Sequence, residues 1–217
     1  MATRKAVYPS LPLDDTLLNR VVSNAKDWAL CHGFVTRPRE HADKSDSCSH
    51  AHFMLLPSKV PRGIYEQATN VQKDMNLLYF LVSWDYDFIN ESLREFAEVD
   101  EFTRRLLQIY TTIYEEGINQ KTVIQLQRSD YICHSTVKGV QLKQVKVNVM
   151  PTDGGSMGDL CTKMHTDIFR VLGFAKKETE RLVPKNNSTA THAAALFRAW
   201  YGLFSTWAVF ARNSCRF

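Results

Sequence analysis

Hydrophobic residues in the first half of the chain recur at helical spacing. The longest stripe runs through residues 62–83, where apolar side chains step by three and four positions and predict a core helix of about six turns. Its members are Ile64, Ala68, Val71, Met75, Leu78 and Val82. An earlier helix is predicted to begin at Asp14 or Asp15 and to end at Gly33. Its inward stripe consists of Leu17, Val21, Ala25 and Trp28.

Two shorter helices are predicted next, each opened by an aspartate that can cap its N-terminus. Asp85 precedes the first helix. Its inward positions are Ile89, Leu93 and Phe96. Asp100 precedes the second, which ends near Gly117. Its inward positions are Phe102, Leu106, Ile109 and Ile113. The first half of the chain is therefore predicted to be nearly all helix.

The period of the hydrophobic pattern then changes from about 3.6 to 2, which indicates β-strands. Alternation at residues 122–126 predicts one strand, and alternation over 142–150 predicts a second strand after a turn. The two strands form an antiparallel hairpin. On the second strand Lys146, Asn148 and Met150 share one face, and three alternating valines share the other.

The last part of the chain returns to helix. A glycine-rich turn at 154–158 leads into a helix whose inward positions are Leu160, Met164, Ile168 and Val171. Another helix is predicted at 189–201, and the apolar run from Leu203 to Phe210 predicts a buried strand. Such a strand normally needs neighbours in a layered α/β sheet. The sequence ends at Phe217, so this layered unit is expected to be incomplete.

Composition limits the class of protein. The 217 residues are 44% hydrophobic and 23% charged, which supports one substantial core or two small ones and excludes disorder and coiled coil. The net charge of +4 comes without a Lys/Arg run longer than two residues, so no nucleic-acid partner is predicted. Because no signal-like segment and no apolar run near 18 residues occurs, we expect a cytoplasmic protein with no membrane partner.

Cysteine and histidine spacing raises one metal hypothesis. The five cysteines are scattered and contain no Cys-x-x-Cys pair, which predicts free thiols. Cys48, His50 and His52 alternate and could share one face, with His41 as a fourth zinc ligand. The usual ligand pairs are missing, so an ordinary surface loop is the favoured interpretation.

Charged and polar residues gather where the predicted hairpin meets the glycine turn. Arg128 and Asp130 lie at the end of the first strand. Lys146 and Asn148 lie on the second strand, and the turn at 154–158 follows. A turn with free N–H groups before a helix can receive an anion or a carboxylate. Alternatively, Arg128 is only the ion-pair partner of Asp130, and the glycines form only a turn.

Whole phrases of the sequence carry a resemblance to a known family. They match in order over residues 15–210 and are Ser49–Ser58 (SHAHFMLLPS), Glu66–Leu78 (EQATNVQKDMNLL), Gln127–Tyr131 (QRSDY), Leu142–Asn148 (LKQVKVN) and Ala199–Trp200. In these phrases the chain resembles eukaryotic glutathione synthetase, the ATP-grasp ligase that joins γ-glutamylcysteine to glycine. The resemblance implies ATP and Mg²⁺ as cofactors, γ-glutamylcysteine and glycine as substrates, and a homodimer.

The resemblance also implies an architecture of the α+β or α/β class. We expect a helical N-terminal region at 1–118, and a β-hairpin plus helix of an ATP-grasp-like core at 119–185. A truncated start of the α/β substrate-binding subdomain follows at 186–217. The family's ATP-grasp lysines and mobile glycine-rich loops lie beyond the position equivalent to Phe217. Because those groups orient ATP, we expect no catalytic residue in this chain and no ligation by it alone.

Three positions of the family's site can be carried over, and one of them is changed. Arg128 matches an arginine that contacts γ-glutamylcysteine, since a guanidinium suits a carboxylate. Asn148 matches an asparagine that helps to hold Mg²⁺ at the ATP phosphates. Lys146 stands where the family has a glutamate metal ligand. A charged lysine offers Mg²⁺ no lone pair, and like charges about 4 Å apart repel by about 4 kcal/mol at an effective dielectric of about 20. We expect that metal site to be lost or rebuilt.

The family's substrate-binding loop is altered as well. Its positions here are Met150, Pro151, Thr152 and Asp153, one residue short before the double glycine. Pro151 removes a backbone N–H donor, and Asp153 places a carboxylate near the expected substrate carboxylate. Affinity for γ-glutamylcysteine is therefore expected to fall.

Three explanations follow for such a chain. It descends from an ATP-dependent ligase and is truncated and inactive as written, or it is a non-catalytic glutathione-synthetase-like protein that acts by binding. The third is an incomplete gene model whose natural product continues beyond Phe217. A faulty chain end would not change position 146, so Lys146 bears on the choice between the first two.

Overall fold

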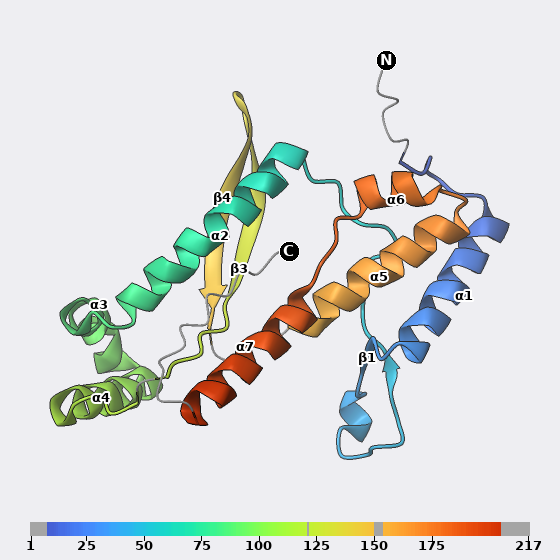
Figure 1. The fold of residues 1–217 in the computed structure, drawn as a ribbon. Coiled ribbons are helices and arrows are strands. Elements are labelled where there is room, and N and C mark those ends of the chain that lie inside the picture. The colour runs from blue at the N-terminus through green and yellow to red at the C-terminus, as the bar shows by residue number, and fades with distance from the viewer. Residues whose placement is uncertain (1–7, 121, 150–153, 205–217) are drawn as a thin grey trace. The chain divides into compact units, whose positions relative to one another are not determined.

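The structure of the protein is a computed structural model that describes residues 8–120, 122–149 and 154–204 (Figure 1). In chain order the elements are α1 Asp15–Cys31, β1 Val35–Thr36, η1 Arg39–His41, β2 Ser49–His50, α2 Arg62–Val82, α3 Tyr86–Val99, α4 Glu101–Glu116, β3 Arg128–Thr136, β4 Gly139–Asn148, α5 Gly155–Val171, α6 Lys176–Leu182 and α7 Ser188–Phe204. Helices with two small antiparallel sheets confirm the expected α+β class.

Within the described residues the chain divides into two compact units. The first unit comprises residues 8–61 and 154–189. The second unit comprises residues 62–149 and 190–204. None of the helices described has the length and apolarity needed to cross a membrane.

An apolar core organises the first unit, in which α1 and α5 lie side by side (Figure 1). Asp14 caps α1 by accepting a hydrogen bond from the backbone N–H of Leu17 at 2.9 Å. The buried residues of the core are Val21, Ala25, Ala29, Phe34, Ala51, Met164 and Ile168. Leu17 and Trp28 pack against this cluster and are partly buried. The inward stripe predicted for α1 is therefore confirmed.

A buried histidine ties the loop after β2 to α5. His165 is 7% exposed, and its Nε2 lies 2.9 Å from the carbonyl oxygen of Met54. Its Nδ1 lies 3.7 Å from Cys161 Sγ. Burial lowers the pKa of His165, and the hydrogen bond to Met54 acts in the opposite direction. The neutral ring therefore fits, with Nε2–H donating to Met54 and Nδ1 accepting from the thiol.

In the second unit, α2 packs against the β3–β4 hairpin and α3 packs along α4 (Figure 1). Tyr86 of α3 stacks on Tyr114 of α4, with ring centroids 3.9 Å apart. The buried residues described in this unit are Gln72, Ala97, Gln127, Ser129, Ala195, Ala199 and Gly202. Large apolar side chains are missing from that set. Among the residues that the structure describes, the second unit therefore has a smaller and more polar interior than the first.

The helix α4 forms where it was predicted, but its inward stripe was predicted on the wrong face. The partly buried residues of α4 are Thr103, Leu107, Tyr110 and Thr111. The predicted stripe of Phe102, Leu106, Ile109 and Ile113 is instead between 46% and 71% exposed. The first three predicted positions each precede a better-covered one, and one residue rotates a helix by about 100°. On the neighbouring helices Phe96 and Leu78 are likewise exposed.

The strand boundaries also differ from those predicted. Residues 122–126 form no strand, and β3 begins at Arg128. The partner strand explains this, because β4 ends at Asn148 opposite Arg128 and leaves earlier residues without a ladder partner. At the C-terminal end Leu203 and Phe204 belong to α7, so the strand predicted to start there is wrong at these two positions. Residues 205–210 of that prediction lie outside the described residues.

Candidate functional site

Four polar side chains lie together near the open end of the β3–β4 hairpin. Arg128 and Asp130 are on β3, and the antiparallel ladder pairs them with Asn148 and Lys146 of β4, respectively. Directly opposite residues, and residues two apart on one strand, share a face of the sheet. The prediction that Lys146 and Asn148 share a face is therefore confirmed. We call these four residues the hairpin cluster.

A β-bulge in β4 sets this arrangement. Asp130 lies opposite Lys146, but the next residue, Tyr131, lies opposite Gln144, so Val145 has no counterpart on β3. Positions 144 and 146 would share a face of a regular strand. The bulge instead pairs Gln144 with Tyr131 and Lys146 with Asp130, on opposite faces. The regular alternation predicted along this strand is therefore interrupted at Val145.

Asp130 is the centre of the hairpin cluster. Its Oδ1 accepts a hydrogen bond from Arg128 Nε at 3.0 Å. Its Oδ2 accepts a hydrogen bond from Asn148 Nδ2 at 3.2 Å and lies 3.6 Å from Lys146 Nζ. The hydrogen bond from Arg128 is the largest cause that lowers the pKa of Asp130, and Asn148 and the positive charge of Lys146 add to it. One carboxylate thus accepts hydrogen bonds from Arg128 and Asn148 and forms an ion pair with Lys146.

A buried glutamine of α2 holds the opposite face of the hairpin. Gln72 is 2% exposed, and its Nε2 donates to Ser129 Oγ at 3.1 Å and to Asn76 Oδ1 at 2.6 Å. Tyr131 donates from its hydroxyl to Gln72 Oε1 at 3.5 Å. Because a buried amide is costly unless it is hydrogen-bonded, these contacts fix β3 against α2. Ser129 sits between two members of the hairpin cluster, so Gln72 helps to position that cluster.

Sequence reasoning missed Gln72. The visible signal was a glutamine at the edge of the apolar stripe predicted for residues 62–83, next to Val71. A polar side chain at the edge of a buried stripe needs partners, and here they come from β3.

The hairpin cluster does not fit Mg²⁺, the cation that the family resemblance implies. Magnesium binds through carboxylate and other oxygen ligands in near-octahedral geometry. Asp130 supplies the cluster's sole carboxylate, and both of its oxygens already face donors. Lys146 adds a second positive charge where a cation would have to sit. Across the described residues no three His, Cys, Asp or Glu side chains gather into a group that could hold a metal.

The other predicted site residues are placed as follows. Met150, Pro151, Thr152 and Asp153 lie outside the described residues. Of the suggested zinc ligands, Cys48 is exposed. His50 is turned toward its own segment, with Nδ1 at 3.0 Å from the carbonyl oxygen of Ala51 and its ring against Phe53. These contacts match the surface-loop interpretation of that segment.

Comparison with known proteins gives the family. The model of the eukaryotic glutathione synthase ATP-binding domain matches residues 15–206. Glutathione synthetase of Mus musculus is 32% identical over 194 residues, which cover 89% of this chain and 40% of that protein. The chloroplastic glutathione synthetase of Arabidopsis thaliana is 29% identical and covers 92% of this chain and 38% of its own length.

A solved structure shares the fold as well. The structure of a glutathione synthetase-like effector from Globodera pallida, in its apo form, superposes with a TM-score of 0.71 at 25% identity. The match covers 93% of this chain and 43% of that one. The chain thus spans about two-fifths of the length of the relatives it matches. By the family model, and by the order of the phrases at the hairpin and on α2, the chain belongs to the eukaryotic glutathione synthetase family.

Proposed function

We propose that this protein is a glutathione-synthetase-like polypeptide whose hairpin cluster works without a divalent metal, and that by itself it does not ligate γ-glutamylcysteine to glycine. The ion pair between Lys146 Nζ and Asp130 Oδ2, at 3.6 Å, carries this proposal. It occupies the position where the family resemblance places a glutamate ligand of Mg²⁺. The ammonium group of Lys146 therefore takes the place of a bound Mg²⁺ ion.

The charges of the cluster support the proposal. Arg128 and Lys146 carry one positive charge each against the single negative charge of Asp130, so the cluster has a net charge of +1. Phosphoryl chemistry needs positive groups aimed at the transferring phosphate, but these two cations are directed at Asp130. Arg128 keeps a guanidinium that suits a carboxylate ligand, although it must share that group with Asp130. We therefore propose an anion-tolerant site without ligase activity.

A binding or interaction role is the second candidate. The solved relative from Globodera pallida is described as a glutathione synthetase-like effector. A protein that acts by contact tolerates both Lys146 and a shortened substrate loop. An incomplete gene model of an active ligase is the third candidate, and the transcript past codon 217 tests it. An open frame that encodes a glycine-rich loop and later lysines would favour it.

Calorimetry tests the proposal directly. The expressed chain is titrated with MgATP and then with γ-glutamylcysteine, with the Mus musculus relative as a positive control. We expect heat of binding from the control and no ternary complex with this chain. Saturable MgATP binding by this chain would overturn the metal-free proposal. A Lys146→Met variant, which removes the charge but restores no ligand, should also bind no MgATP.

The family resemblance further supports a homodimer and a cytoplasmic location as proposals. The Arabidopsis thaliana relative is chloroplastic, so location differs within the family. Fractionation of cells with an antibody to this chain, and light scattering of the purified protein, test the two proposals separately.

A further inference from the structure

The β-bulge at Val145 gathers positive charge on one face of the β3–β4 hairpin. Lys143 and Lys146 are three residues apart, so a regular strand would turn them to opposite faces. The ladder instead pairs Lys146 with Asp130. It pairs Lys143 with Ile132, which lies two residues farther along β3. Because residues two apart on β3 share a face, Lys143 and Lys146 also share one.

The burial of the side chains agrees with this assignment of faces. Lys143 is exposed, and the side chain of Lys146 is 57% exposed. Leu142, Gln144 and Val147 are half-buried, and they lie on the face that packs against α2 (Figure 1). The two lysines therefore lie with the hairpin cluster on the face turned away from α2. We call Arg128, Lys143 and Lys146 the basic face.

The basic face carries more positive charge than its own acidic residue neutralises. Arg128, Lys143 and Lys146 are all the Lys and Arg residues of the two strands, and Asp130 is the sole acidic residue there. Three positive charges against one negative charge leave a net charge of +2. The 3.6 Å from Lys146 Nζ to Asp130 Oδ2 is longer than a hydrogen bond. Neither lysine donates a hydrogen bond to another of the described residues.

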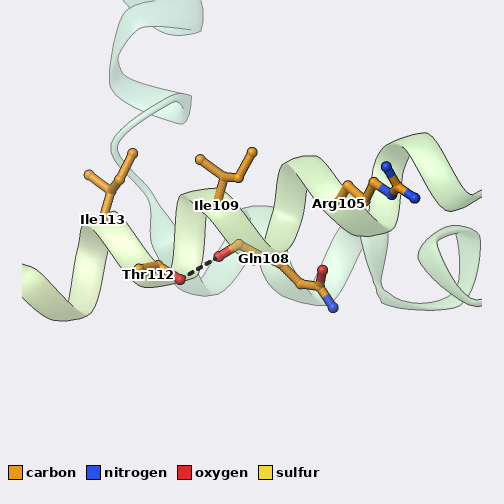
Figure 2. A pocket seen from close by; sticks show the side chains of 5 residues that line it. All are labelled: Arg105, Gln108, Ile109, Thr112 and Ile113. Atoms are coloured by element: carbon orange, nitrogen blue, oxygen red, sulfur yellow. Dashed lines mark hydrogen bonds between the residues drawn. The ribbon is translucent and has the colours of Figure 1, made fainter.

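The pocket on α4 is a poorer place for an anion. It is lined by Arg105, Gln108, Ile109, Thr112 and Ile113 (Figure 2). All five belong to a single helix, so the pocket is an open depression along one element. Arg105 is the only cation that lines it, and Arg105 already forms an ion pair with Glu101. The excess of positive charge therefore distinguishes the hairpin from this pocket.

The spacing of the two lysines indicates the class of ligand. They pair with residues two apart on β3, which corresponds to about 7 Å along a strand. An ammonium group binds a phosphate as a point charge, and a guanidinium binds it through paired hydrogen bonds. A diphosphate places two or more negative charges within this span, whereas a monocarboxylate offers one. A nucleic acid normally makes more phosphate contacts than three cations provide.

We propose that the basic face binds a diphosphate group, free or carried by an organic molecule, without a divalent metal. Lys143 and Lys146 each meet one phosphate, and Arg128 borders the site while it holds Asp130. The proposal rests on the metal-free hairpin cluster of the proposed function, to which it adds Lys143 and a ligand class. Mg²⁺ bound to the diphosphate neutralises the charge that the lysines meet, so Mg²⁺ should weaken binding.

Calorimetry with sodium pyrophosphate in a metal-free buffer tests the proposal. We expect saturable binding to the full chain. Lys143→Gln and Lys146→Gln should each weaken binding about fivefold, which equals about 1 kcal/mol for one exposed charge pair. Lys138→Gln is the control, because it removes the same charge in the hairpin turn. Lys138 lies five residues from Lys143, roughly 17 Å along the strand and beyond a Debye length of about 10 Å, so its loss should leave the affinity unchanged.

ADP in the same buffer identifies the source of the diphosphate. An affinity above that of pyrophosphate assigns the site to an organic diphosphate, and an affinity at or below it assigns the site to the free anion. Circular dichroism checks that each variant folds.

Two results would overturn this proposal and leave the metal-free cluster standing. One is the absence of saturable binding of both pyrophosphate and ADP, with or without Mg²⁺. The other is an equal affinity of the natural chain and the Lys143→Gln variant. Binding that appears only after Mg²⁺ is added would instead overturn both the diphosphate site and the metal-free cluster.

Discussion

Replacing Lys146 with glutamate puts a second carboxylate beside Asp130. The Lys146 Nζ to Asp130 Oδ2 distance is 3.6 Å. A unit-charge pair at that distance interacts by roughly 5 kcal/mol at an effective dielectric of about 20, and by roughly 1 kcal/mol at that of water. The Lys146 side chain is 57% exposed, so the water limit applies and measured exposed pairs are worth up to about 1 kcal/mol. Losing the attraction and adding repulsion should therefore cost about 1–2 kcal/mol in all.

Magnesium should offset that loss in the glutamate variant alone. Two carboxylates beside Asn148 supply the oxygen ligands that the natural cluster lacks. For a dissociation constant of roughly 1 mM, 10 mM Mg²⁺ would stabilise the folded variant by roughly 1.4 kcal/mol. Urea unfolding with and without Mg²⁺ measures both effects. Lys146→Gln, which removes the attraction without adding repulsion, should lose less stability and ignore Mg²⁺.

Unfolding of Lys146→Glu at the same urea concentration as the natural chain, with no response of either protein to Mg²⁺, would refute this prediction. That outcome would mean that the ion pair is fully screened and that Lys146 is not what excludes the metal. A gain in stability of the natural chain with Mg²⁺ would also contradict the proposal, because it would show that the unchanged protein binds the metal.

Three further predictions address the two units. Met164→Ala removes a side chain that is fully buried and should cost about 2–5 kcal/mol in urea unfolding; a loss under about 1 kcal/mol would contradict the assigned core. Since burial lowers the pKa of His165, the unfolded state binds its proton more readily, so stability should fall as pH drops below about 6.5. His165→Gln should flatten that pH dependence. An unchanged slope of stability against pH would mean that other titratable groups cause it. Gln72→Leu removes the hydrogen bonds that Gln72 makes with Ser129 and Tyr131, and should lower the free energy of unfolding by about 1–3 kcal/mol, measured by hydrogen exchange in β3. Unchanged exchange would contradict the positioning role of Gln72.

Local rules account well for the helices. The aspartates at 14, 85 and 100 each accept a hydrogen bond from a backbone N–H three residues on, as expected for caps. The stripe on α1 was predicted correctly because its apolar partner α5 is present. On α4 the partly buried face carries Thr103, Leu107, Tyr110 and Thr111, while the more apolar face is exposed, so the hydrophobic pattern alone does not say which face a neighbour covers. Packing, not periodicity, makes that choice.

The hairpin shows where pattern reasoning stops. Alternation at 122–126 was sufficient to predict a strand, but a strand also needs a ladder partner, and β4 ends too early to provide one. The departure at Lys146 was visible from the resemblance. Its contact with Asp130 depends on a register that includes one unpaired residue, and no periodicity rule predicts that residue.

The unpaired Val145 in β4 has a consequence for how this family member can change over time. A one-residue slip in a regular hairpin would exchange its two faces, whereas a bulge pins the register. Substitutions at position 146 therefore change the contact with Asp130, while those at position 144 affect the face that packs against α2. The two positions are therefore constrained by different contacts. The charge at position 146 can thus change without disturbing the contact of Gln72 that holds the hairpin against α2.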